Sequence, residues 1–358
     1  MSSNTSDTSP ILIMKPLDMP PSSIYPSFFL GILAYCLILV FNLTILLTIL
    51  LNKQLHKPMY LLLINLSIND MTGATAFYPQ LISSILSQDR TISRPACVVQ
   101  AVVVHMYGGG SLLTLTAMAY DRYVAICNPL RYNAVMSPGC LARIIAAVWL
   151  TDVTVMGVLF SLLARFPFCH SLLPDIICTN SALTRVVCGD TSVNNYYGLF
   201  LTVFLQSIAL LTVIFTYNQI LLCCLRNRQS DTKNKAARTC ATHLVVFVLF
   251  ELTTLFTVVS YRFSSVSPVL QRAIGISTIV FPPILNPLIY GFNTKEIKSR
   301  VIDVCNKTVF SAFTRRRLRR KIFHEDSDEL LGFEAHCPCL IHVPADGHFD
   351  RGTDHGLV

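Results

Sequence analysis

The sequence predicts an all-α membrane protein: a bundle of seven transmembrane helices followed by a short cytoplasmic amphipathic helix. Composition, the spacing of apolar stretches and the placement of basic residues predict this fold. Of the 358 residues, 53% are hydrophobic and 13% are charged, against roughly 25% charged in an ordinary soluble domain. A hydrocarbon core about 30 Å thick needs about 20 mostly apolar residues per helix. The chain therefore has room for several spans joined by short loops.

Seven apolar stretches are long enough to span a membrane. They cover residues 26–51, 59–86, 97–127, 141–166, 196–225, 239–261 and 270–291. The chain accordingly divides into four predicted parts. They are an extracellular amino segment (1–25), the seven-helix domain (26–291), a cytoplasmic amphipathic helix (292–310) and a disordered cytoplasmic tail (311–358).

Basic residues in the short loops predict the orientation, because Lys and Arg concentrate on the cytoplasmic side. The loops after the first, third and fifth stretches and the segment after the seventh are basic, whereas the amino segment has only Lys15. The basic residues are Lys53, Lys57, Arg131, Arg226, Arg228, Lys233, Lys235, Arg238, Lys295, Lys298, Arg300 and Lys307. We therefore expect a plasma-membrane protein with its amino terminus outside and its carboxyl terminus inside.

Two kinds of modification are expected on the outer side. Asn4 begins the glycosylation sequon Asn4-Thr5-Ser6. Cysteines placed in an oxidising compartment tend to pair, and the outer loops carry Cys97, Cys169, Cys178 and Cys188. Four cysteines allow three connectivities, which spacing alone does not resolve.

Other classes of function find little support. The net charge is +8, but no soluble basic domain exists to bind nucleic acid. An enzyme would need clustered nucleophiles, bases or metal ligands, whereas His105 and His243 fall on different predicted helices. No enzyme activity, cofactor or nucleic-acid partner is expected. A transporter would show inverted repeats, and none is visible.

The third stretch ends in Asp121-Arg122-Tyr123. Charged groups inside a membrane helix cost about 2.5–3.5 kcal/mol at its centre, so each one suggests a function. An Asp beside an Arg can hold the guanidinium in a resting ion pair, and its release would expose five donors to a partner. The alternative is a pair that only anchors the helix end at the interface.

The seventh stretch contains Asn286-Pro287-Leu288-Ile289-Tyr290. Proline removes a backbone hydrogen bond and kinks a helix, and a nearby amide can satisfy the freed group. With Tyr290 on the weakened turn, the segment is predicted to be a hinge with two states. The alternative is a helix that is simply bent.

As a set, four segments resemble the odorant (olfactory) receptors, a family of rhodopsin-like G-protein-coupled receptors. The most extensive is the fifteen-residue segment 118–132, MAYDRYVAICNPLRY, and the others are 55–60, 235–244 and 282–290. The resemblance covers about residues 26–300. It implies a small-molecule odorant ligand and a heterotrimeric G protein of the stimulatory olfactory type that raises cyclic AMP. A non-olfactory rhodopsin-like receptor for another small ligand is the alternative, and a transporter is less favoured.

The resemblance also implies roles for individual residues. Asp121, Arg122 and Tyr123 would form the resting lock and the G-protein contact, and Tyr217 would be the partner of Arg122 in the active state. The activation switch would consist of Asp70, Ser111, Asn286, Pro287 and Tyr290. The disulfides would be Cys97–Cys178 and Cys169–Cys188. Asp70 and Ser111 form a candidate sodium site, although Ser111 stands where these receptors often carry Glu.

One face of the sixth stretch suggests a ligand site. Glu251, Leu255, Val258 and Arg262 follow helical spacing, and His105 lies near the outer end of the third stretch. Glu251 stands where the family usually has an aromatic residue. We predict an anionic ligand whose acid group meets Arg262 and His105. The alternative is that Arg262 snorkels to the interface while His105 only packs.

The segment after residue 300 carries a basic run, residues 315–321, RRRLRRK. Such a run can bind anionic lipid of the inner leaflet, at about 1 kcal/mol per basic residue. Membrane lipid is therefore an expected partner, and a solvated disordered run is the alternative.

Overall fold

The structure, a computed structural model, describes residues 10–15, 20–87, 89–226, 230–260, 267–292, 294 and 296–302. Several predictions fall outside these residues. They concern Asn4, Arg262, the tail 311–358 with its basic run, and most of the predicted amphipathic helix 292–310, of which 296–302 is helical.

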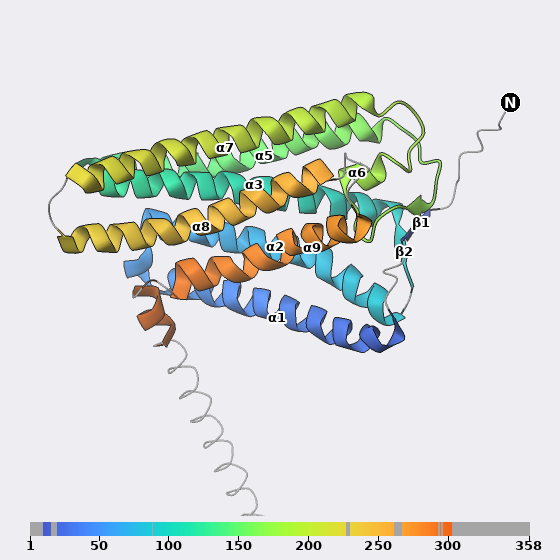
Figure 1. Ribbon diagram of the computed structural model, residues 1–358, viewed down its shortest axis with the longest axis horizontal. Coiled ribbons are helices and arrows are strands. Elements are labelled where there is room, and N and C mark those ends of the chain that lie inside the picture. The colour runs from blue at the N-terminus through green and yellow to red at the C-terminus, as the bar shows by residue number, and fades with distance from the viewer. Residues whose placement is uncertain are drawn as a thin grey trace, which may run out of the picture. The chain divides into compact units, whose positions relative to one another are not determined.

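Seven long helices form one bundle in the described part of the chain, which confirms the predicted fold class (Figure 1). They are α1 (Pro21–Leu51), α2 (Pro58–Ser87), α3 (Arg94–Cys127), α5 (Pro138–Ala164), α7 (Ser192–Arg226), α8 (Ser230–Ser260) and α9 (Pro268–Asn286). By length and composition, α1, α3, α5, α7 and the segment Leu270–Gly291 are each apolar enough to span a membrane. Helices α2 and α8 carry more polar residues, such as Asn65, Asn69 and Asp70 in α2.

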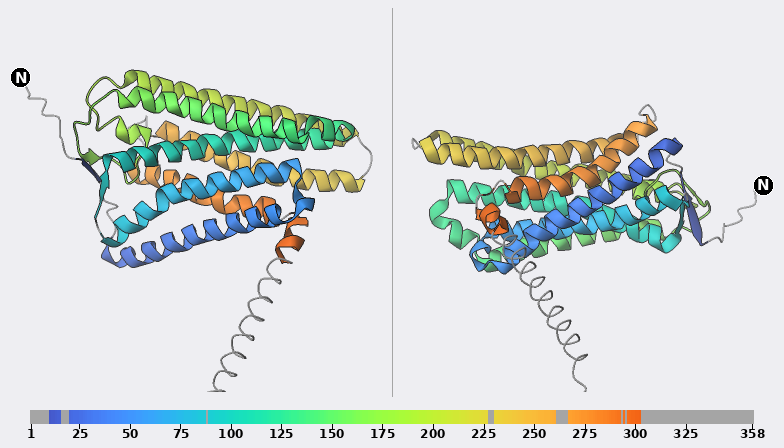
Figure 2. Two further views of the ribbon diagram at one scale, coloured as in Figure 1. Left: turned by 180° about the vertical axis from the view of Figure 1, so that it is seen from behind. Right: turned by 90° about the horizontal axis from the view of Figure 1, so that it is seen from below.

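Helix α3 lies at the centre of the bundle. It contacts α2, α5, α7 and α8, whereas α1 lies beside α2 and α9 (Figures 1 and 2). Several helices start before the apolar stretch that predicted them: α1 at Pro21, α7 at Ser192 and α8 at Ser230. Backbone hydrogen bonding continues a helix after its side chains turn polar, so hydropathy marks the span and not the full helix.

A small sheet at one end of the bundle was not predicted. Strand β1 (Ile11–Met14) pairs antiparallel with β2 (Thr91–Ser93) and parallel with β3 (Leu172–Leu173). Within β1, Leu12 and Met14 are buried while Ile11 and Ile13 are exposed, which is the alternation of a strand with one covered face. The short helix α6 (Asn180–Leu183) lies at this same end, here called the sheet end (Figure 1).

The opposite end carries the short connections. These are η1 (Lys53–Leu55), η2 (Pro129–Arg131) and α4 (Tyr132–Val135), and α9 continues there into the π-helical turn η3 (Pro287–Phe292). Pro287 begins this turn and has no N–H to donate, so the regular helical ladder is interrupted there.

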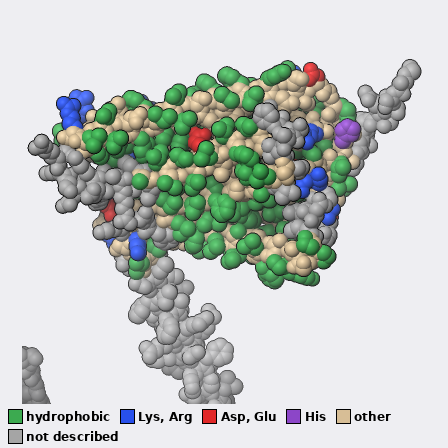
Figure 3. All heavy atoms as spheres, viewed as in Figure 1, with side chains coloured by type: hydrophobic (Ala, Val, Ile, Leu, Met, Phe, Trp, Pro, Cys, Tyr) green, Lys and Arg blue, Asp and Glu red, His purple; other side chains and the backbone are tan. Residues whose placement is uncertain are grey.

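The outward faces of the helices are strongly apolar. Phe200, Leu211 and Leu252 are among the large hydrophobic residues that lie exposed. Hydrophobic side chains cover most of the face shown in Figure 3, and Lys and Arg side chains gather toward its ends. An exposed apolar belt with charged ends is the surface expected of a helix bundle in lipid.

Candidate functional site

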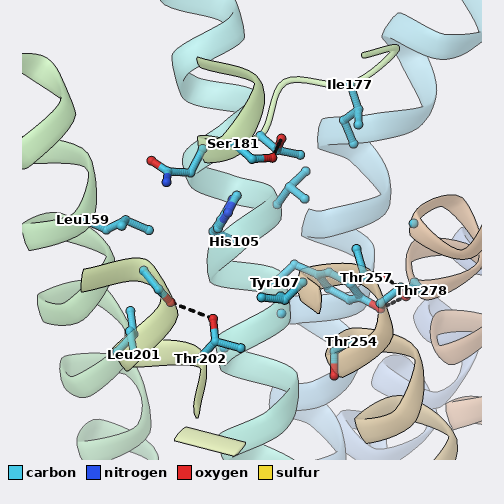
Figure 4. A pocket seen from close by; sticks show the side chains of 18 of the residues that line it. His105, Tyr107, Leu159, Ile177, Ser181, Leu201, Thr202, Thr254, Thr257 and Thr278 are labelled. Carbon is cyan, nitrogen blue, oxygen red and sulfur yellow. Dashed lines mark hydrogen bonds between the residues drawn. The ribbon is translucent and has the colours of Figure 1, made fainter. Parts of the chain in front are cut away.

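A cavity of about 750 Å³ lies inside the bundle toward the sheet end. Its walls come from α3, α5, α7, α8 and α9, with the segment between α5 and α7 closing over it. The labelled side chains in Figure 4, which include His105, Leu159, Leu201, Thr254 and Thr278, surround this space. Its size and mixed apolar and polar lining are those of a small-molecule site.

The structure brings together only part of the predicted ligand site. His105 and Val258 line the cavity, whereas Glu251 and Leu255 do not, and Leu255 is 44% exposed on the outer surface. The cavity face of α8 consists of Phe250, Thr254, Thr257 and Val258. It is therefore turned by about one residue from the face predicted by sequence. The phase of α8 follows its packing against α3, α7 and α9, which spacing alone does not reveal.

Several lining residues were missed by the sequence analysis. Two cations, Arg185 between α6 and α7 and Arg272 near the start of α9, line the cavity, as do Gln206 and Thr278. The signal available was the position of Arg272 at the outer end of an apolar stretch. Nothing in the sequence indicated that the segment around Arg185 folds inward.

Two disulfides hold the segment that covers the cavity. Cys97 at the start of α3 is joined to Cys178, and Cys169 is joined to Cys188, each with a Cα–Cα distance of 5.4 Å. Both pairings are those that the family resemblance implied. Because Cys178 lies between the lining residues Ile177 and Thr179, the first disulfide fixes the cavity roof to α3.

Two of the backbone carbonyls freed by prolines in α9 and at the start of η3 accept hydrogen bonds from side chains of other helices. Pro282 and Pro287 have no N–H to donate to the carbonyls four residues earlier, those of Thr278 and Pro283. The hydroxyl of Tyr107 on α3 donates to the Thr278 carbonyl at 3.0 Å. The amide of Asn42 on α1 donates to the Pro283 carbonyl at 2.8 Å. The amide that satisfies the Pro283 carbonyl therefore comes from Asn42 of α1 and not from the nearby Asn286.

Asn286 instead reaches the centre of the bundle. Its side-chain N–H donates to Asp70 Oδ2 at 2.8 Å, and both residues are buried. Ser111 lies on α3, where its hydroxyl oxygen accepts from Asn69 at 2.9 Å. The second oxygen of Asp70 and the amide oxygen of Asn286 are buried, and no residue that the structure describes hydrogen-bonds either of them. Hard cations bind oxygen ligands, so these two atoms fit the predicted sodium site.

The Asp121–Arg122 pair lies on α3 at the opposite end from the cavity. Arg122 donates from Nη2 and Nε to Asp121 Oδ2, at 2.6 and 3.1 Å. The hydroxyl of Tyr132 in α4 donates to the other oxygen of Asp121 at 2.9 Å. Burial, reinforced by the Asp121 carboxylate, raises the pKa of Tyr132 well above its usual value, so the hydroxyl remains a donor.

Three further predicted residues, Tyr123, Tyr217 and Tyr290, pack against aromatic or buried apolar side chains. The Tyr123 ring meets the Phe215 ring of α7 with centroids 6.0 Å apart. Tyr217 of α7 packs against the buried core, and Tyr290 of η3 is buried within it. The predicted contact between Tyr217 and Arg122 belongs to an active state and stays a prediction.

A membrane bundle of seven helices, with a cavity at one end under a disulfide-linked roof and a partly buried Asp-Arg pair at the other, defines a G-protein-coupled receptor. A family model described as "Olfactory receptor" matches residues 31–307. Human olfactory receptor 52K2 is 35% identical over 274 residues, which are 76% of this chain and 87% of that receptor. Human olfactory receptor 10A2 is 33% identical over 291 residues, 81% of this chain and 96% of that receptor.

The chain belongs to the olfactory receptor family. It is therefore an odorant receptor and a multi-pass protein of the plasma membrane. Receptors of this family are not enzymes, which agrees with the sequence prediction. Family membership also favours the olfactory prediction over the non-olfactory and transporter alternatives.

Proposed function

We propose that this receptor takes a small odorant into the cavity and, in response, activates a stimulatory olfactory-type G protein that raises cyclic AMP. One observation carries the proposal: α3 runs from the cavity wall at His105 to the ion pair at Arg122. At roughly 1.5 Å per residue, these positions are about 25 Å apart along the helix. A single rigid element thus touches both sites.

The resting state in this proposal is the arrangement in the structure. Arg122 is bound to Asp121, and Tyr132 holds the second oxygen of that carboxylate. Activation would move α8 outward and transfer Arg122 to Tyr217 and to the G protein. An odorant favours this state only if it binds the active arrangement more tightly than the resting one.

The centre of the bundle is the proposed switch. Asp70 and Asn286 join α2 to α9 immediately before Pro287, and Tyr290 follows in η3. The buried oxygens of Asp70 and Asn286, with Ser111 nearby on α3, are the residues that would hold a sodium ion. That ion would supply a positive charge opposite the Asp70 carboxylate.

The proposed orientation places the sheet end outside. The two disulfides at that end support it, because disulfides persist in the oxidising extracellular space. Asn4 would then be available for glycosylation. The basic run 315–321 would face the anionic inner leaflet.

The predicted anionic ligand remains a proposal that depends on Arg262, which lies outside the described residues. Arg272 lines the cavity and offers a described cation for the same acid group. The acid group of such a ligand would bind Arg272 near the roof of the cavity, because Arg272 lies close to the start of α9 at Pro268.

Coupling is tested by expressing the full chain with a stimulatory olfactory G protein and measuring cyclic AMP across an odorant panel. The proposal expects a dose-dependent rise that Arg122→Ala abolishes while surface staining is retained. Arg143→Ala is the matched control, because Arg143 is exposed and, within the residues that the structure describes, hydrogen-bonds only the Gly139 carbonyl of its own helix. A ligand response that survives Arg122→Ala, or that appears only through an inhibitory G protein, would contradict the proposal.

A further inference from the structure

Part of the cavity wall, here called the deep wall, is formed by Thr202, Thr254, Thr257, Thr278, His105 and Gln206. The hydroxyl and ring donors of this wall are bound within the protein. Four threonines belong to this wall, and Figure 4 shows all of them around the cavity. Each hydroxyl donates to a backbone carbonyl of its own helix. The bonds are Thr202 to Gly198 at 2.8 Å, Thr254 to Phe250 at 2.8 Å, Thr257 to Thr253 at 2.7 Å and Thr278 to Ile274 at 3.0 Å.

A threonine hydroxyl has one hydrogen and two lone pairs. Once the hydrogen is bound to the helix backbone, only the lone pairs remain for the cavity. The four threonines therefore offer a ligand acceptors and no donors.

His105 on α3 has the same character. Its Nδ1 lies 2.8 Å from the carbonyl oxygen of Ala101. A carbonyl only accepts, so Nδ1 carries the hydrogen and the neutral ring keeps a lone pair on Nε2. His105 lines the cavity as a further acceptor.

Gln206 on α7 provides the decisive atom. Its amide nitrogen donates to Thr254 Oγ1 at 2.9 Å. Because the Thr254 hydrogen is already bound to its own helix, Thr254 can only accept, and this fixes which way the Gln206 amide points. The amide oxygen of Gln206 is then left buried with no hydrogen-bond partner among the described residues, on a residue that is 9% exposed and lines the cavity.

An amide in the roof repeats this pattern. Asn194 donates to the Leu159 carbonyl at 2.7 Å, so its own oxygen is the atom that accepts from Asn180 at 2.8 Å. The side-chain oxygen of Asn180 is therefore also buried, with no hydrogen-bond partner in the described part of the chain, and Asn180 lines the cavity.

We propose that the deep wall selects neutral ligands that donate a hydrogen bond, with aliphatic alcohols as the chemical class and the Gln206 amide oxygen as the specificity-determining acceptor. An alcohol O–H satisfies that buried oxygen, whereas an ether or ester of the same shape leaves it unpaired. A carboxylate brings no donor and would face lone pairs at the deep wall, so an anionic ligand would have to place its acid group near Arg272 at the roof instead. The alkyl chain would lie against Leu159, Leu201 and Leu205, which also line the cavity.

This inference rests on the proposed function, since it takes the cavity to be the odorant site. Binding is therefore measured without a G protein, as thermal stabilisation of the purified full-length receptor. The probes are straight-chain alcohols from 1-hexanol to 1-nonanol and methyl ethers with the same number of heavy atoms. Cyclic AMP is measured in parallel with the same probes.

We expect the best alcohol to bind at least about tenfold more tightly than its matched ether, because a site built to bond a hydroxyl rejects analogues that lack it. Gln206→Leu should remove this preference. Gln206→Glu should retain it, since a neutral carboxyl can donate to Thr254 and still present an acceptor oxygen. Thr253→Val is the matched control, because among the described residues the Thr253 hydroxyl bonds only carbonyls of its own helix and Thr253 does not line the cavity. This variant should leave the preference unchanged.

The outcomes separate the two proposals. Alcohol-selective binding without a cyclic AMP response supports the inference and counts against the proposed coupling. Ethers that bind as well as alcohols, no stabilisation by any alcohol in the series, or a preference that survives Gln206→Leu would overturn the inference.

Discussion

One asparagine joins three helices of the receptor, and its removal gives a measurable prediction. The indole N–H of Trp149 on α5 donates to Asn65 Oδ1 at 2.7 Å, and Asn65 Nδ2 donates to Thr114 Oγ1 on α3 at 2.9 Å. Hydrogen bonds between membrane helices are worth about 0.6 kcal/mol on average and at most about 1.7 kcal/mol. Asn65→Leu breaks two of them, so it should lower the free energy of unfolding by about 1–3 kcal/mol.

A double-mutant cycle isolates the Trp149 bond. Trp149→Phe should cost about 0.6–1.7 kcal/mol for its one hydrogen bond, in addition to any change in packing. In the Asn65→Leu background the hydrogen-bond part of that cost should vanish, which gives a coupling free energy of about 0.6–1.7 kcal/mol.

The assay is denaturant unfolding of the purified receptor in mixed micelles. Thr154→Val is the control on α5, the helix of Trp149, because Thr154 is exposed and its hydroxyl bonds only the Leu150 carbonyl among the described residues. It should change the free energy of unfolding by less than about 0.5 kcal/mol. The reasoning would be refuted if the loss of unfolding free energy in the double variant equalled the sum of the two single-variant losses to within about 0.3 kcal/mol.

Two further predictions concern the glycines of α3 and the Asp-Arg pair. A Cβ at position 109 would collide with the buried carboxylate of Asp152, whereas nothing lies within 4 Å of a Cβ at position 108. Gly109→Ala should therefore lower surface expression several-fold, whereas Gly108→Ala should not. Equal surface staining of the two variants would show that α3 and α5 can separate at little cost. Tyr132→Phe removes the second anchor of Asp121 and should raise basal cyclic AMP, and a basal signal equal to that of wild type would mean that Tyr132 does not restrain the pair.

Sequence reasoning succeeded where a property repeats over many residues. The seven helices follow from runs of about twenty apolar residues, because lipid leaves no other way to satisfy the backbone of a span. The Asp121–Arg122 pair also follows, since the two residues are adjacent in the chain.

Sequence reasoning failed where a contact depends on the rotation of a helix about its axis or on a residue far away in the sequence. The ligand face of α8 was assigned from Glu251 and Arg262, yet packing turns Phe250 and Thr254 toward the cavity. Prolines in a helix sequence predict which carbonyls lose their backbone donor. They do not predict which distant side chain donates instead, as Asn42 does to the Pro283 carbonyl. Strand β1 was missed because its four residues are all apolar in sequence and alternate only in burial, and four residues are too few to mark a strand.

Epitope tags at the two termini of the full chain test the central claim most directly, because the proposed outer cavity and inner G-protein face both depend on the direction in which the bundle crosses the membrane. The account predicts that the amino-terminal tag stains on intact cells and that the carboxyl-terminal tag stains only after permeabilisation. Both tags staining alike on intact cells would contradict it.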